Sequence, residues 1–165
     1  MQRIGDSPGP RAAGFTLIEI LVVVVLIAIA ATLVTVKLQP DDRALLKEEA
    51  TRLAAVLTQA RDEAVITGSG IGWRGSTNGY QFFRRNDERQ WIAIEKDEVF
   101  HPRSLPQDVS LTDVEIGATK AGANDMLILS ASAANPEYRI VLAFRNARLQ
   151  VRAEPSGPAL VDNVQ

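Results

Sequence analysis

Cysteine is absent from this chain of 165 residues, and histidine occurs only once, at His101. Without cysteine, the protein can form neither a disulfide nor a thiolate metal site or nucleophile, so packing and hydrogen bonds alone must hold the fold. A single histidine is too few for a histidine-based zinc site or a catalytic triad, and we expect His101 to lie in a surface loop. The sequence therefore predicts no catalytic residue, no metal and no other cofactor.

The sequence also has no clear calcium-binding loop and no clear phosphate-binding loop. Asp41-Asp42 and Asn124-Asp125 could offer oxygen ligands, but neither pair has the regular acidic spacing of a calcium loop. The glycine-rich stretch Gly68–Gly72 follows a predicted helix and precedes a predicted strand, which is the reverse of the order in a phosphate-binding loop. We interpret this stretch as a flexible connection.

An excess of positive charge is missing as well. The formal net charge is −2, which gives no electrostatic footprint for general nucleic-acid binding. Four arginines do gather near the C-terminus, and we interpret them as outward, solvated side chains: Arg139, Arg145, Arg148 and Arg152. Nucleic acid is therefore not expected as a partner, although this cluster leaves DNA binding open as the alternative.

One long apolar run stands out against this background. Phe15–Val36 holds about 22 residues, which as a helix at 1.5 Å per residue would extend about 33 Å, close to the hydrocarbon thickness of a bilayer. Arg3 and Arg11 precede the run, and the positive-inside tendency places its start in the cytoplasm. The sequence thus predicts a single-pass anchor in the bacterial inner membrane, with the rest of the chain in the periplasm.

Glu19 is the exception within this apolar run. An unpaired carboxylate inside a bilayer costs about 2.5 to 3.5 kcal/mol at the centre and less near the interface. Glu19 could simply lie at headgroup level, where it would also suit the positive end of the helix dipole. Alternatively, it has a cationic partner.

The residues around Glu19 favour the second interpretation. The sequence Gly14-Phe15-Thr16-Leu17-Ile18-Glu19 closely resembles the processing signal of type IV pilins and type II secretion pseudopilins. The resemblance implies that a prepilin peptidase cuts after Gly14, that Phe15 becomes the N-methylated terminus, and that Glu19 is an assembly carboxylate that meets a neighbouring subunit's N-terminus. An amine beside a carboxylate in a low-dielectric bundle is favourable only when the two are paired.

Two other interpretations of the N-terminal region remain open. In a conventional secretory signal peptide, Ala28-Ile29-Ala30 would be the small-residue cleavage motif. In a plain membrane anchor, nothing would be removed. The first residue of the mature protein separates these cases, because it would be Phe15 for a pilin-like protein, Ala31 for a secretory signal and Met1 for an uncleaved anchor.

The rest of the chain divides into a helix and a β-rich head. Pro40 should kink or interrupt the first helix, and an amphipathic helix is predicted over Asp41–Thr67, ending at Gly68. Its apolar positions recur at helical spacing: Leu46, Ala50, Leu53, Leu57, Ala60 and Ala64. The predicted divisions are a leader (1–14), a transmembrane and filament-core helix (15–39), an amphipathic helix (40–68) and a β-rich periplasmic head (69–165).

Short alternating runs predict strands in the head. They cover Ile71–Arg74, Tyr80–Arg84, Trp91–Glu95, Val109–Ile116, Met126–Ser130, Tyr138–Phe144 and Arg148–Ala153. The last two runs predict a half-buried hairpin with its turn at Asn146. We also predict that Tyr80, Phe82 and Trp91 pack on the helix as core residues. The expected class is α+β, with a long N-terminal helix packed on an antiparallel sheet.

A second resemblance narrows the family. The segment Gln59–Gly68, with its A-R-D-E-A pattern ending in glycine, closely resembles the helix end of the minor pseudopilin H and fimbrial T family. Tyr80-Gln81-Phe82 with Trp91, and Asn135–Ile140, are similar to that family's aromatic hairpin and proline-led strand. The chain departs from the family where Ala131-Ser132-Ala133-Ala134 replaces a glycine-rich turn, and the residues after Gly157 match no family feature.

This resemblance implies a type IV pilin-like fold and a structural role. An H-type minor pseudopilin is a subunit of the tip or initiating complex of the type II secretion pseudopilus, which assists export of folded proteins across the outer membrane. The implied partners are the prepilin peptidase, the major pseudopilin, other minor pseudopilins of the I, J and K types, and inner-membrane lipid before assembly. The alternative is a minor type IV pilin of the fimbrial T kind, acting in pilus assembly or DNA uptake.

Overall fold

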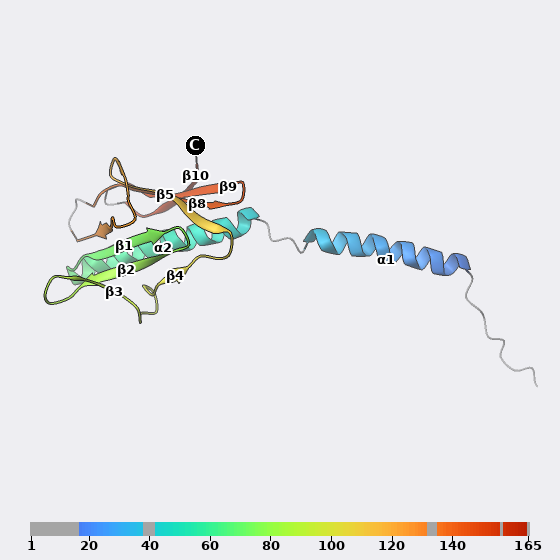
Figure 1. Ribbon diagram of the computed structural model, residues 1–165, viewed down its shortest axis with the longest axis horizontal. Helices are drawn as coiled ribbons and strands as arrows, with labels where there is room; N and C mark the ends of the chain where they lie inside the picture. The colour runs from blue at the N-terminus through green and yellow to red at the C-terminus, as the bar shows by residue number, and fades with distance from the viewer. Residues whose placement is uncertain (1–16, 38–41, 132–134, 156, 165) are drawn as a thin grey trace, which may run out of the picture. The chain divides into compact units, whose positions relative to one another are not determined.

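The computed structural model describes residues 17–37, 42–131, 135–155 and 157–164 (Figure 1). The chain forms two compact units, Met1–Pro40 and Asp41–Gln165, and each is considered by itself. Pro40, where the sequence predicts a kink, lies outside the described residues.

The first unit contains the helix α1, Leu17–Lys37. Its sequence includes the β-branched run Val22–Val25, which would disfavour an isolated helix in water. The large side chains described along it are all exposed within this chain, from Val23 at 46% to Leu17 at 85%. The first unit therefore presents a helix with an apolar surface.

The second unit begins with the helix α2, Asp42–Thr67, within one residue of the prediction. All the apolar positions predicted from helical spacing are 0% exposed: Leu46, Ala50, Leu53, Leu57, Ala60 and Ala64. Gly68 ends the helix with a φ of 66°, a left-handed conformation that glycine adopts without a Cβ penalty. The apolar face of α2 thus forms one side of the hydrophobic core of the head.

Two antiparallel sheets pack with α2 to form the head (Figure 1). The first sheet has the order β3-β2-β1-β7, with β4 paired to β2, and the second has the order β10-β9-β8-β5-β6. The strands are β1 (Ile71–Ser76), β2 (Gly79–Arg85), β3 (Trp91–Ala93), β4 (Arg103–Ser104), β5 (Val109–Ile116), β6 (Thr119–Lys120), β7 (Leu127–Leu129), β8 (Tyr138–Phe144), β9 (Ala147–Ala153) and β10 (Leu160–Asn163). The predicted α+β class is confirmed.

The C-terminal hairpin of β8 and β9 forms as its alternation predicts. Phe144 pairs with Ala147, so two residues make the turn, and Arg145 takes the left-handed conformation with a φ of 52°. The inward positions of both strands are buried against the core: Tyr138, Ile140, Leu142, Phe144, Leu149 and Val151. The period-2 pattern therefore identified which face of this hairpin is covered.

The aromatic core differs from the prediction at one position. Tyr80 and Phe82 are buried, with their ring centroids 5.9 Å apart, and Trp73 lies 6.2 Å from Tyr80. The prediction for Trp91 was wrong. Trp91 pairs with Arg85, across the alternation from Phe82, so its ring lies on the outer face of the sheet, where the guanidinium of Arg85 stacks 4.9 Å from the ring centroid.

The glycine-rich stretch before β1 is also more than a connection. Gly72 lies within β1, and a Cβ built on it would come within 2.2 Å of the Met126 sulfur and 3.3 Å of the Trp91 ring. The missing side chain lets these two residues lie flat against the sheet. The prediction of a flexible connection therefore fails from Ile71 onward.

Three short strands were not predicted: β4, β6 and β10. The segment after Gly157, which matched no family feature, forms β10 at the edge of the second sheet beside β9. Arg152 forms an ion pair with Asp162, and the Thr58 hydroxyl of α2 accepts a hydrogen bond from the Ala159 amide at 3.1 Å. Residues 159–163 are thus fixed to both β9 and α2.

Candidate assembly site

The predicted processing residues Gly14 and Phe15 lie outside the described residues. Glu19 lies in the first turn of α1, where its carboxylate suits the positive end of the helix dipole. Its described neighbours along the helix are exposed apolar side chains, with Leu17 at 85%, Ile18 at 70% and Ile20 at 52%. Glu19 is thus an acid at the beginning of an otherwise apolar helical surface.

The apolar surface of α1 continues through the rest of its described side chains. Large aliphatic residues are exposed on all sides of the helix over the described positions 21–29: Leu21, Val22, Val23, Val24, Val25, Leu26, Ile27 and Ile29. Among the residues that the structure describes, no helix combines the length and apolar character needed to cross a membrane.

The head contains a buried ion pair that the sequence reasoning missed. Arg103 of β4 donates to Glu49 of α2 at 2.6 Å, and the Glu49 side chain is only 4% exposed. The second carboxylate oxygen of Glu49 and the Nε of Arg103 are buried without a hydrogen-bond partner. The only available sequence signal was the position of Glu49, immediately before Ala50 and three residues after Leu46 on the buried stripe.

This ion pair fixes β4 to the core next to Tyr80. Tyr80 pairs with Arg103 in the β2–β4 ladder, which brings the phenol close to the charged pair. Burial raises the pKa of Tyr80, while the positive charge of Arg103 opposes the shift and Glu49 reinforces it. The pair therefore joins the first sheet to α2 through charge as well as through apolar packing.

Two of the four C-terminal arginines, Arg139 and Arg152, pair with acidic side chains. Arg139 donates to Glu115 and, at 3.2 Å, to Asp113, which also binds Lys120 at 2.8 Å. The hydrogen bond from Lys120 is the largest influence holding the pKa of Asp113 below its usual range.

The remaining members of the arginine cluster lie on β9 or in the turn before it. Arg152 pairs with Asp162, and the Arg145 guanidinium lies 5.2 Å from the Phe144 ring centroid. Arg148 is exposed on β9. Arg139 and Arg152 therefore pair with acidic side chains, whereas Arg145 and Arg148 are exposed.

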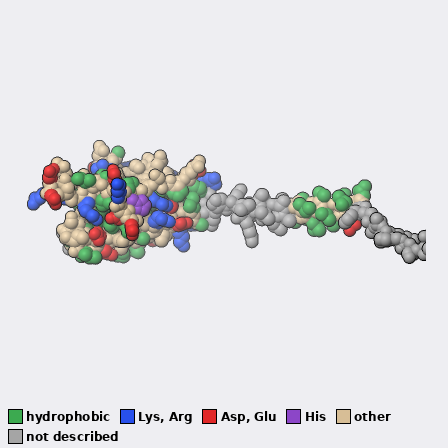
Figure 2. Space-filling model, turned by 90° about the horizontal axis from the view of Figure 1, so that it is seen from below, with side chains coloured by type: hydrophobic (Ala, Val, Ile, Leu, Met, Phe, Trp, Pro, Cys, Tyr) green, Lys and Arg blue, Asp and Glu red, His purple; other side chains and the backbone are tan. Residues whose placement is uncertain are grey.

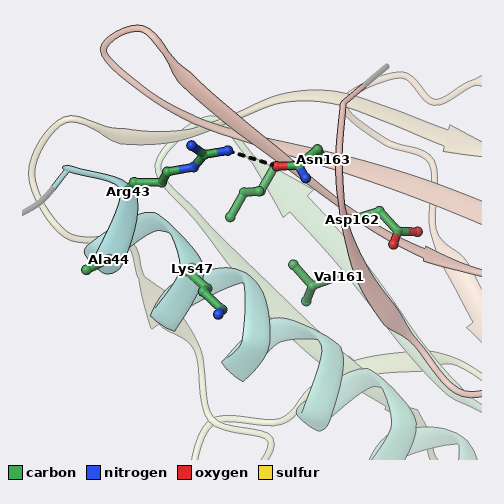
Figure 3. Close-up of a pocket in the computed structure, with 7 residues that line it drawn as sticks. Arg43, Ala44, Lys47, Val161, Asp162 and Asn163 are labelled. Atoms are coloured by element: carbon green, nitrogen blue, oxygen red, sulfur yellow. Dashed lines mark hydrogen bonds between the residues drawn. The ribbon is translucent and has the colours of Figure 1, made fainter.

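A groove of about 520 Å³ opens between the first turns of α2 and the C-terminal strand β10 (Figure 3). We call it the α2–β10 groove, and it is lined by Arg43, Ala44, Lys47, Leu149, Val161, Asp162 and Asn163. Arg43 donates to the Asn163 side-chain oxygen at 3.2 Å across its mouth. A second, smaller cavity of about 300 Å³ lies where β1 of the first sheet approaches β5 of the second.

The other candidate ligand residues do not converge. His101 is exposed, and its Nδ1 lies 3.2 Å from the Asp97 backbone oxygen. The Asp125 carboxylate accepts a hydrogen bond from the Gly122 amide at 2.7 Å. Within the described residues, no group of three or more histidine, aspartate or glutamate side chains could hold a metal ion.

Two family models match the chain. The model of the prokaryotic N-terminal methylation motif covers residues 9–35, and that of type II transport protein GspH covers residues 49–159. The chain belongs to the GspH family. This result confirms the family predicted from Gly14–Glu19 and Gln59–Gly68.

Two curated relatives are both named type II secretion system protein H. The chain is 37% identical over 109 residues to type II secretion system protein H of Aeromonas hydrophila, and 32% identical over 101 residues to the protein of that name in Pseudomonas aeruginosa. These matches cover 64% and 60% of this chain, but only 58% and 56% of the relatives' lengths. The chain thus matches little more than half of each relative.

Solved structures of pseudopilins share the fold. The minor pseudopilin EpsH of Vibrio cholerae superposes with a TM-score of 0.62 over 74% of this chain and 96% of its own, at 16% identity. GspH of Escherichia coli gives a TM-score of 0.56 over 76% of this chain and 94% of its own, also at 16% identity. At this identity the likeness establishes the pilin-like fold alone.

Proposed function

We propose that this protein is a minor pseudopilin of the type II secretion pseudopilus. It would act as a structural subunit of the tip or initiating complex and assist the export of folded proteins across the outer membrane. The observation that carries the proposal is the union, in one chain, of an N-terminal methylation motif and a GspH-family head. The names of the curated relatives, both secretion proteins H, favour secretion over the fimbrial alternative.

The first step of the proposal is anchoring and processing. The apolar run Phe15–Val36 holds the precursor in the inner membrane, with Arg3 and Arg11 on the cytoplasmic side. A prepilin peptidase then removes residues 1–14, and Phe15 becomes the methylated N-terminus. The exposed aliphatic side chains of α1 support this step, because such a surface requires lipid or other subunits around it.

The second step is assembly, in which Glu19 has the central role. A carboxylate in an apolar bundle is stabilised when a cationic amine neutralises it, and the N-terminus of a neighbouring subunit supplies that amine. Pairing of Glu19 with that amine therefore makes docking into the filament energetically favourable. The partners proposed are the major pseudopilin and the minor pseudopilins of the I, J and K types.

The third element is the head, 69–165, which would lie in the periplasm with the amphipathic helix 40–68 on its inner face. Its role is mechanical, because a subunit of a fibre that moves cargo must keep its shape under load. The extensive core around α2 and the buried Glu49–Arg103 pair suit that role.

The decisive experiment is to identify the N-terminus of the mature protein. The full chain, co-expressed with a prepilin peptidase, should begin at Phe15 and carry one added methyl group by mass spectrometry. Gly14→Val should block cleavage, whereas the matched change Gly9→Val within the leader should not. A mature chain that begins at Ala31 or Met1 would overturn the proposal.

A second experiment separates secretion from DNA uptake. Deleting the gene should abolish or strongly reduce export of type II substrates while leaving transformation by added DNA intact. Complementation by the unaltered gene should restore export. Normal export with lost transformation would contradict the proposed function and favour the fimbrial alternative.

A further inference from the structure

We propose that the outer face of the first sheet binds an extended, acidic segment of another protein. The proposal goes beyond the proposed function, because it concerns the head alone and does not depend on which filament the chain joins. We call this surface the β2 outer face, and it comprises the side chains of Arg74, Gln81, Phe83, Arg85, Trp91, Met126 and Ile128.

The first argument is that large apolar side chains lie on the side of the sheet away from the core. Phe82 is 0% exposed in the core, so the alternation of β2 directs its neighbour Phe83 to the outer face. Trp91 lies on the same face, and Ile128 is 40% exposed there because the leucines on either side of it point inward. An exposed apolar face with aromatic side chains is typical of an interaction surface.

The second argument is that glycine makes this face flat and rigid. A Cβ built on Gly72 would come within 2.2 Å of the Met126 sulfur, and one built on Gly70 would lie 3.8 Å from the Trp91 ring. The thioether and the indole therefore lie close against the strand. Side chains that are already held in place lose little conformational freedom when a partner covers them.

The third argument is that two cations stack on the aromatic rings of this face. The Arg74 guanidinium lies 4.9 Å from the Phe83 ring centroid, and that of Arg85 lies 4.9 Å from the Trp91 ring centroid. The Arg74 Nε is buried without a hydrogen-bond partner, and within the described part of the chain neither arginine forms an ion pair. Because charges of both signs are interspersed on the head, as Figure 2 shows for one face, these guanidiniums suit separate carboxylates, which each can bind by two parallel hydrogen bonds.

The spacing of the two arginines fits an extended segment. Arg74 pairs with Gln81, four residues before Arg85 on β2, and four residues of strand span about 13 Å. In an extended partner, acidic residues four positions apart span the same distance and point to the same side. One apolar side chain lies midway between them on that side, where it would contact Phe83.

A pocket beside Arg74 supplies partners for the backbone of such a segment. It has a volume of about 410 Å³, and Asn78, Gln81 and Ser104 contribute amide and hydroxyl groups to its lining. An extended segment carries backbone N–H and C=O groups that require hydrogen-bond partners, whereas a helix pairs most of its own. The pocket therefore favours an extended segment over a helix.

The test titrates the full chain, in a non-ionic detergent, with a synthetic peptide that is capped at both ends. In this peptide two glutamates four positions apart flank a central leucine, and the indole N–H signals of the protein are followed by NMR. The Trp91 signal should shift and saturate, whereas that of Trp73, which is 1% exposed in the core, should not. The same peptide with glutamine in place of glutamate should bind about tenfold more weakly, because each exposed ion pair contributes about a threefold change in affinity.

The matched control removes the same charge elsewhere on the head. Arg74→Gln/Arg85→Gln should lower the affinity for the glutamate peptide about tenfold, whereas Lys47→Gln/Arg148→Gln, on α2 and β9, should leave it unchanged. Equal loss in both double variants would overturn the site. Equal affinity for the glutamate and glutamine peptides, which needs no variant of the protein, would overturn the recognition of acidic side chains.

Two other occupants of the β2 outer face would give different results. If a second copy of this chain covers it, the Trp91 signal shifts when the protein is concentrated without peptide. If single carboxylates suffice, sodium acetate at the same carboxylate concentration displaces the peptide. Either result would overturn the proposed segment.

Discussion

The two helices are consecutive in the chain and similar in length, yet they differ completely in burial. Leu21 and Leu26 of α1 are 57% and 60% exposed, whereas Leu53 and Leu57 of α2 are 0% exposed. The 26-residue α2 has an apolar stripe with polar residues around it, while the 21-residue α1 exposes large aliphatic side chains at most of its described positions. The difference shows that α2 is stabilised by packing within its own unit, whereas the described side chains of α1 have no such packing within theirs.

The largest effect that would test this difference is a cavity in the head core. Phe82→Ala should destabilise the head by about 3 to 5 kcal/mol, because Phe82 is fully buried between Tyr80 and Phe100. Its thermal unfolding, followed by near-ultraviolet circular dichroism of the full chain in detergent, should shift strongly downward. The matched truncation Leu26→Ala in α1 should leave the midpoint unchanged, and an equal shift would show that the two units unfold together.

The next largest effect concerns the buried charge in the head. Arg103→Met leaves the Glu49 carboxylate buried without its partner and should cost about 3 kcal/mol. Glu49→Gln/Arg103→Met removes both charges and should recover part of that loss, as denaturant unfolding of both variants would measure. A double variant as unstable as the single one would mean that the pair acts by shape rather than by charge.

A charge on α1 should behave differently, because we propose that Glu19 pairs with the N-terminus of another subunit. Glu19→Gln should lower incorporation into filaments by a factor of about 30, the equivalent of about 2 kcal/mol for losing one member of a buried charge pair. Membrane insertion and the unfolding midpoint of the head should not change. Quantifying sheared filaments against the membrane fraction tests this, and normal incorporation would contradict the pairing of Glu19 with a neighbour.

The smallest effect is a pH dependence confined to the head. Hydrogen bonds from the Phe100 and Val99 amides are the main influences that lower the pKa of Asp97. Because its folded-state pKa lies below its unfolded value of 3.8, Asp97 contributes stability that is present above that value and is lost as pH falls through the folded pKa. Asp97→Asn should therefore flatten the decline of head stability below pH of about 4. Lys96→Gln, next to it, should leave that slope unchanged.

Sequence patterns located the head's regular elements well where one face is buried. The strands β5 and β8 have the predicted bounds, and α2 differs by one residue. Burial on one face imposes a period of 2 or of 3.6 on the sequence, and that period can be read without the structure. The same regularity predicted the hairpin of β8 and β9.

The patterns failed where position depends on residues distant in sequence. Trp91 and Trp73 are both tryptophans in predicted strands, yet only Trp73 faces the core. Strand β10 carries no clear alternation, and it forms because β9 and α2 offer partners for its backbone and for Asp162. Short edge strands have little pattern of their own, so tertiary context decides them.

The sequence by itself determined the family, the processing signal at Gly14–Glu19 as a prediction, and the periodic helix and strands, because each is encoded by neighbouring residues. Tertiary structure alone decided that Glu49 meets Arg103, 54 residues away, and that Arg43 and Lys47 share a groove with Asn163. Buried ion pairs and grooves bring together residues that are far apart in the chain, and the local periodicity of the sequence does not predict such contacts. Chain folding, rather than local pattern, therefore created the head's charged contacts.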